Sequence, residues 1–248
     1  MLKKIVLVGI SIFLLPGMAI AAVAVDLATY GTGSRSTADG SLVAADGWSG
    51  TDNNGFQIAW SIALSGGTYT YGYTISGEGG SNLSKDLSHW LLQVTNPSLD
   101  TDFLNVSPLF SGDSPKTFEP SGVSTGDQPS MPANLYGIKW DAPSGTKTYS
   151  VSFETTKDPV WGDFYAKDGV QVIHLDSGNI QIAATAWNIG FGTDPTGSTD
   201  FTYWIPTPDG GEPTNGNGNG THEPIPEPTI LALFGLGSLG LFHLRKKN

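Results

Sequence analysis

Residues 56–75 read FQIAWSIALSGGTYTYGYTI, and this stretch decides the fold class. Apolar residues stand at every second position in both halves of it. Such alternation with a period of two is typical of a β-strand that buries one face. Ser65-Gly66-Gly67 lies between the halves, so the stretch predicts a β-hairpin. Trp60 falls on the buried face of the first strand, and Gln57 falls on the opposite face.

Similar apolar or alternating runs follow along the chain and are separated by clusters of Pro, Gly, Asn and Asp. These runs are His89–Thr95, Leu135–Trp140, Tyr149–Phe153, Val160–Ala166, Val170–Leu175 and Ile180–Trp187. Neither helical periodicity nor an internal repeat of fixed period is present in this region. We therefore expect an all-β body, an antiparallel β-sandwich, over residues 25–206. A jelly roll or a closed barrel is the alternative.

The N-terminal segment predicts a secretory signal peptide over residues 1–24. A short basic start precedes an apolar run of 11 residues, Ile5–Leu15, which is too short to span about 30 Å of hydrocarbon as a helix. Ala19-Ile20-Ala21 and Ala22-Val23-Ala24 both satisfy the small-x-small rule for cleavage. The mature chain is therefore expected to start near Ala22 or Val25.

The C-terminal segment predicts a membrane helix with a cytoplasmic end. Thr229–Leu244 is a mostly apolar run of 16 residues, and the basic residues Arg245-Lys246-Lys247 follow it directly. Residues 207–224 form a Gly-, Asn- and Pro-rich linker without an apolar side chain between Thr207 and Glu223. Pro226-Glu227-Pro228 stands between this linker and the apolar run.

The order of these three parts over residues 225–248 resembles the C-terminal sorting signal of PEP-CTERM proteins. The resemblance implies that an exosortase, a transpeptidase-like membrane enzyme, removes the helix after it has anchored the protein transiently. It also implies delivery to the cell envelope, the outer surface or an exopolysaccharide matrix. Pro159–Gly169 and Leu135–Lys139 are similar to a body pattern of some PEP-CTERM proteins, which carries no catalytic role over to this chain.

Charge and composition exclude several classes of function. Five of the 12 Lys and Arg residues lie in the terminal segments 1–24 and 225–248, which leaves seven against 22 of the 23 Asp and Glu residues. A body this acidic repels phosphate backbones, so we expect no nucleic-acid partner. The absence of Cys rules out disulfides, thiol catalysis and Cys-ligated zinc. The spacing of the four His residues does not suggest a transition-metal site, and His89 is expected to be buried and hydrogen-bonded.

Trp161, Asp163 and Tyr165 form the most distinctive candidate ligand site. Aromatic rings can stack on the apolar faces of sugars while a carboxylate accepts hydrogen bonds from their hydroxyl groups. The alternative, which we favour for Trp161, is that alternating aromatic residues on a strand belong to the core. Asp168-Gly169 supports this alternative because the pair is a hairpin-turn signal.

Calcium is the only cofactor that the sequence suggests, as a structural ion. Asp52, Asp100 and Asp102 place oxygen ligands on loops at short spacing, although neither loop matches an EF-hand. Turn formation by these residues is the alternative interpretation.

We expect an exported protein without catalytic residues, with a structural or adhesive role in exopolysaccharide or biofilm. A carbohydrate-binding module or a secreted glycoside hydrolase is the alternative. The hydrolase would need two facing carboxylates in one cleft.

Overall fold

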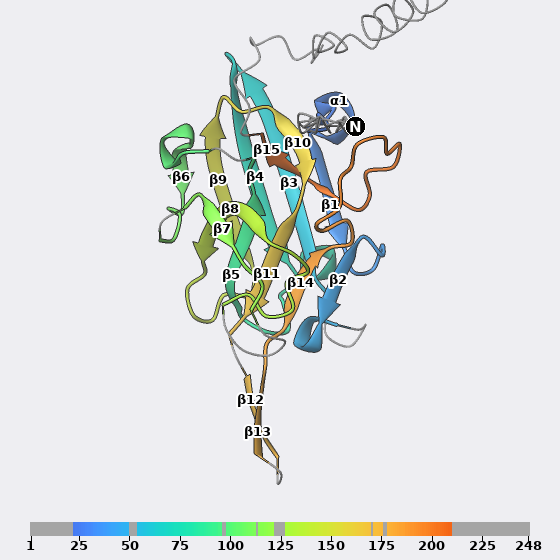
Figure 1. The fold of residues 1–248 in the computed structure, drawn as a ribbon, viewed down its shortest axis with the longest axis vertical. Helices are drawn as coiled ribbons and strands as arrows, with labels where there is room; N and C mark the ends of the chain where they lie inside the picture. The colour runs from blue at the N-terminus through green and yellow to red at the C-terminus, as the bar shows by residue number, and fades with distance from the viewer. Residues whose placement is uncertain are drawn as a thin grey trace, which may run out of the picture.

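The computed structural model describes residues 22–49, 54–95, 98–112, 114–121, 127–169, 171–175 and 178–209, and for 171–175 and 178–182 it describes the backbone alone. Within these residues nearly every element is a β-strand, and two antiparallel sheets pack face to face (Figure 1). Each sheet has two edge strands, so the predicted antiparallel β-sandwich is confirmed and the closed barrel is not formed. Most of the signal peptide and nearly all of the linker and sorting segment lie outside the described residues.

The five-stranded sheet of the described chain contains the predicted hairpin. Its strands, in spatial order, are β1 (Thr32–Ser36), β3 (Gln57–Ser65), β4 (Thr68–Ser76), β9 (Tyr149–Thr155) and β6 (Leu104–Ser107). Gly66 and Gly67 both take positive φ angles in the tight turn, a conformation that favours glycine. Trp60 is buried and Gln57 is only half-buried, which confirms the face assignment of β3.

The second sheet of the described residues has six strands and lies in front of the first in Figure 1. In spatial order they are β2 (Leu42–Ala45), β14 (Thr185–Asn188), β11 (Phe164–Asp168), β5 (Leu87–Gln93), β8 (Leu135–Asp141) and β7 (Lys116–Phe118). The short strands β1, β2, β6 and β7 were not predicted. Three to five residues are too few to display an alternating pattern.

The core between the two sheets is built largely from aromatic rings. Trp90 of β5 and Trp140 of β8 stack with their ring centroids 4.7 Å apart. Across the sandwich, Tyr73 lies 5.6 Å from Trp90 and Phe153 lies 6.0 Å from Trp140. Large buried rings and aliphatic side chains therefore supply the stability that disulfides cannot provide in this chain.

A smaller sheet joins both ends of the body. β10 (Pro159–Gly162) pairs with β15 (Ile205–Pro208), and on its other side it contacts the N-terminal residues that precede the short helix α1 (Leu27–Tyr30). Thr207 is buried in β15. The body therefore extends two residues past the expected boundary at 206, because Thr207 and Pro208 belong to this strand.

Two predicted strands are each interrupted. The run Val160–Ala166 is divided at Asp163, where the chain passes from β10 into β11. The run Ile180–Trp187 is divided between β13 (Gly178–Ile182) and β14. β13 pairs with β12 (Gln171–Leu175) in a separate hairpin that projects from the body in Figure 1. No helix within the described residues is long and apolar enough to cross a membrane, and the expected C-terminal helix lies outside them.

Candidate ligand-binding pocket

A row of polar residues crosses the outer face of the six-stranded sheet, the face directed away from the sandwich core. Lys167 of β11 lies opposite His89 of β5, and His89 lies opposite Asp141 of β8. Thr185 of β14 extends the row on the other side of Lys167. The neighbouring row faces the core and contains Trp90 and other buried apolar residues. Because successive residues of a strand point to opposite faces, the polar row lies on the outer face.

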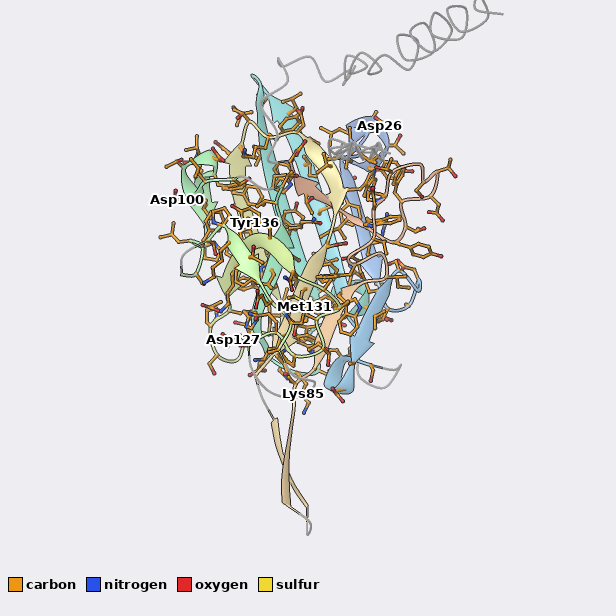
Figure 2. The ribbon with its side chains drawn as sticks, viewed as in Figure 1. Asp26, Lys85, Asp100, Asp127, Met131 and Tyr136 are labelled. Atoms are coloured by element: carbon orange, nitrogen blue, oxygen red, sulfur yellow. The ribbon has the colours of Figure 1, made fainter. Side chains whose placement is uncertain are left out.

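Residues 127–134, the described part of the chain directly before β8, cover part of this outer face. The Tyr165 hydroxyl donates a hydrogen bond of 2.7 Å to the Pro129 carbonyl, and Met131 packs with Leu91 and Tyr165 in a second apolar cluster. Asp127 and Met131 lie in front of the strands of this sheet in Figure 2. This segment therefore forms a wall over one side of the outer face.

An open pocket of about 310 Å³ lies between this segment and the edge of the sheet at β7 and β8. Its walls carry ammonium, amide and hydroxyl donors together with carboxylate acceptors. The lining residues are Ser111, Gly112, Lys116, Thr117, Phe118, Glu119, Asp127, Gln128, Lys139 and Asp141. Lys139 and Asp141 form an ion pair of 3.0 Å, and the Lys116 ammonium lies 5.5 Å from the Phe118 ring centroid.

Burial and neighbouring charges keep His89, in the polar row on the outer face, uncharged at neutral pH. Burial lowers the pKa of His89 to about 4, and the positive charges of Lys139 and Lys167 act in the same direction. The His89 Nε2 atom is buried without a hydrogen-bond partner among the described residues. Burial tends to raise the pKa of Asp141, but the hydrogen bond and charge of Lys139 outweigh it and lower that pKa. Asp141 is therefore ionised at neutral pH.

The comparisons with known proteins concern the C-terminal segment. Residues 224–247 match the family model of the PEP-CTERM protein-sorting motif. The chain carries a PEP-CTERM sorting motif at its C-terminal end. The motif implies export and processing by an exosortase. The matched range contains Pro226-Glu227-Pro228 and Arg245-Lys246-Lys247, which lie outside the described residues. No curated protein and no solved structure matches the chain.

The folded body does not present Trp161, Asp163 and Tyr165 as a platform. Trp161 is 4% exposed, Asp163 6% and Tyr165 0%. The Trp161 ring stacks on Phe201 with centroids 5.1 Å apart and planes within 1° of parallel. The interpretation of these residues as a sugar platform is therefore corrected, because neither ring offers a free face to a sugar. Trp161 packs in the core, which was the alternative interpretation.

Asp163 has a structural position at the junction of β10 and β11. One carboxylate oxygen accepts a hydrogen bond of 2.7 Å from the Asn188 side chain, and the other accepts one of 2.9 Å from the Gly192 backbone N–H. Burial raises the pKa of Asp163 to about 6 in spite of these bonds. The carboxylate thus ties the end of β14 and the loop after it to the strand junction.

The described calcium candidates have local roles. Asp102 accepts a hydrogen bond from the Leu99 backbone N–H and forms an ion pair of 3.1 Å with Lys157. Asp100 accepts a hydrogen bond from the Thr101 backbone N–H. Asp52 lies outside the described residues. In the part of the chain that the structure describes, no group of three or more His, Asp and Glu residues could hold a metal ion.

Sequence reasoning did not identify the pocket. Lys139 and Asp141 alternate on β8, and this spacing could have placed them on one face of a strand. The remaining lining residues come from segments without periodicity, so no local signal joined them to β8.

Proposed function

We propose that the exported body is a non-catalytic module that holds neutral polysaccharide in the pocket at the β7–β8 edge. This activity would give the protein a structural or adhesive role in the exopolysaccharide outside the cell. The pocket is the observation that carries the proposal, and the sorting motif supports it because the motif directs the protein to the side of the membrane where such polymers lie.

The chemistry of the pocket matches a polyhydroxylated ligand. Each sugar hydroxyl group can donate one hydrogen bond and accept others, and the walls offer both kinds of partner in one small space. Asp127, Glu119 and Asp141 supply acceptors, while Lys116 and Gln128 supply donors. The pocket is open at a sheet edge, so a long polymer could pass through the site without ending there.

The net charge favours a neutral polymer over an acidic one. The full chain carries a formal net charge of −11, and five of its 12 basic residues lie in the terminal segments rather than in the body. A polyanion would be repelled by this field at low and moderate ionic strength. A neutral glycan would meet no such barrier.

The carboxyl groups with a raised pKa lie outside the pocket, and this favours binding over hydrolysis. A glycoside hydrolase needs one carboxylic acid that is still protonated near its working pH, beside a second carboxylate. Burial raises the pKa of Asp163 to about 6 and that of Asp168 to about 7, but neither residue lines the pocket. The pocket residue Asp141 has a lowered pKa and pairs with Lys139.

Calorimetric titration of the exported protein with neutral and acidic polysaccharides tests this proposal. Asp127→Ala should weaken binding of a neutral polymer about tenfold, since a hydrogen bond to a charged group is lost. Asp86→Ala, the matched control, removes an exposed carboxylate outside the pocket and should leave binding unchanged. Equal affinity of the two variants would show that the pocket is not the binding site. Release of new reducing ends from the polymer would show that the protein is a hydrolase.

The sorting part of the proposal has a separate test. If an exosortase processes the chain, intact mass measurement of the surface-exposed protein should show that Thr229–Leu244 is gone. Recovery of residues 245–248 in most of the surface-exposed protein would contradict this processing.

A further inference from the structure

The first described residues lie along β10 and pair with it through one isolated antiparallel β-bridge, and this segment is called the N-terminal strand below. The Val23 carbonyl accepts a hydrogen bond of 2.9 Å from the Trp161 backbone N–H. The Val25 backbone N–H donates a bond of 2.8 Å to the Pro159 carbonyl, and Ala24 forms an antiparallel bridge with Val160. This N-terminal strand therefore occupies the edge of β10 that β15 leaves open.

Side-chain packing fixes the same segment. Val25 is buried in a cluster with Trp161 and Trp204, and Val23 packs against that cluster. Immediately after it, the Asp26 side chain accepts a hydrogen bond of 3.0 Å from the Ala28 N–H and caps α1. Both the hydrogen bonds and the apolar contacts thus belong to the folded body.

The two cleavage sites that the sequence allows have different consequences for this strand. Cleavage after Ala24 would remove the Val23 carbonyl that accepts from the Trp161 backbone N–H, and it would place a new charged α-ammonium on Val25, whose side chain is buried in the uncut chain. The N–H of the buried residue Trp161 would then lack its partner, which is unfavourable. Cleavage after Ala21 would keep every bond, with the ammonium on the half-buried Ala22 beyond the last paired residue.

We propose that the signal peptide is removed between Ala21 and Ala22, and that the released N-terminus then completes the small sheet. The step is hydrolysis by a signal peptidase: water adds across the peptide bond, leaving a carboxylate on Ala21 and an amine on Ala22. The proposal rests on the export that the sorting motif implies, and it is independent of the polysaccharide pocket.

N-terminal sequencing of the exported protein, produced from the full-length precursor in a Gram-negative host, tests the assignment. The expected sequence is Ala-Val-Ala-Val-Asp, starting at Ala22. A start at Val25 would overturn the proposal and leave export intact. An uncut chain recovered outside the cell would overturn both the cleavage and the predicted signal peptide, without bearing on the pocket.

Two matched substitutions sharpen the test, because the residue before the cut must be small. Ala21→Leu should block normal processing, so that the precursor accumulates. Ala24→Leu should leave processing unchanged, and the exposed position of Ala24 accommodates the larger side chain. The reverse pattern would overturn the proposal. A chain engineered to mature at Val25 should melt several degrees lower, and an unchanged melting temperature would contradict the structural role of the strand.

Discussion

The guanidinium group of Arg35 lies over the indole ring of Trp60, with its central carbon 5.1 Å from the ring centroid. The same carbon lies 5.9 Å from the ring centroid of Trp161. Arg35 also donates hydrogen bonds to the carbonyls of Trp204 and Phe201, at 3.2 and 2.9 Å. One cation on β1 therefore connects the five-stranded sheet to the segments around β10 and β15.

Arg35→Lys should destabilise the protein although the positive charge is kept. A lysine ammonium cannot stack as a flat group while donating to two separate carbonyls. We expect the free energy of unfolding to fall by about 1–3 kcal/mol, measured by urea denaturation. Ser34→Ala, at the exposed neighbouring position of β1, is the control and should change it by less than about 0.5 kcal/mol. Equal effects would show that the Arg35 contacts contribute little.

Some strands of this fold could be predicted from the sequence and others could not, for a physical reason. β3 and β4 are nine residues each, long enough for alternation to identify the buried face. β1 reads TGSRS and contains no apolar residue. Its position depends on pairing with β3 and on Arg35 contacts with residues more than 160 positions away, which no local pattern encodes.

The same distinction applies to the candidate sites. The aromatic run around Trp161 is compatible with a platform or with a core, and only the packing of Phe201 and Tyr30 on its ring decides between them. The pocket is formed where the segment before β8 folds back over the sheet, and this depends on tertiary contacts such as Tyr165 to Pro129. Loop closure of this kind leaves no periodic signal in the sequence.

Trp60→Ala should cost about 3–5 kcal/mol of stability, because Trp60 is 4% exposed and its Nε1 donates to the Tyr30 carbonyl at 2.9 Å. Gln57→Ala, on the opposite face of β3, loses only the bond that its Oε1 accepts from the Gly79 N–H. That change should cost about 1 kcal/mol or less. Chemical denaturation of both variants compares them directly. A similar loss in the two would mean that the faces of β3 are assigned incorrectly.

Asp168 should make stability depend on pH. Burial raises its pKa to about 7 against an ordinary value of 3.8, with Lys167 and Lys85 opposing the shift and Asp46 adding to it. The folded state therefore holds a proton that the unfolded state releases, so the contribution of Asp168 to stability is lost as the pH rises from about 4 through 7. Asp163, with a pKa of about 6, acts in the same direction, while buried His89 acts in the opposite one.

Asp168→Asn removes this titration while keeping the shape of the side chain. The melting temperature of the variant, relative to that of the original protein, should be higher at pH 8 than at pH 5. Thermal unfolding at the two pH values measures the difference, with Asp86→Asn as an exposed control. A difference that is the same at both pH values would show that Asp168 does not carry a raised pKa in the folded protein.

Trp161→Ala and Asp127→Ala separate the core from the proposed binding site. Trp161 is enclosed by Phe201 on one ring face and by Tyr30 at 5.1 Å in an edge contact, so its removal leaves a cavity. We expect a loss of about 3–5 kcal/mol of stability, with polysaccharide retention reduced only in proportion to the unfolded fraction.

Asp127 is exposed, so its substitution should weaken retention while the melting temperature stays within about 1 °C of the original. Melting temperature and retention are measured on the same preparations. A well-folded Trp161→Ala protein that no longer retains polysaccharide would move the binding site from the pocket to the Trp161 ring.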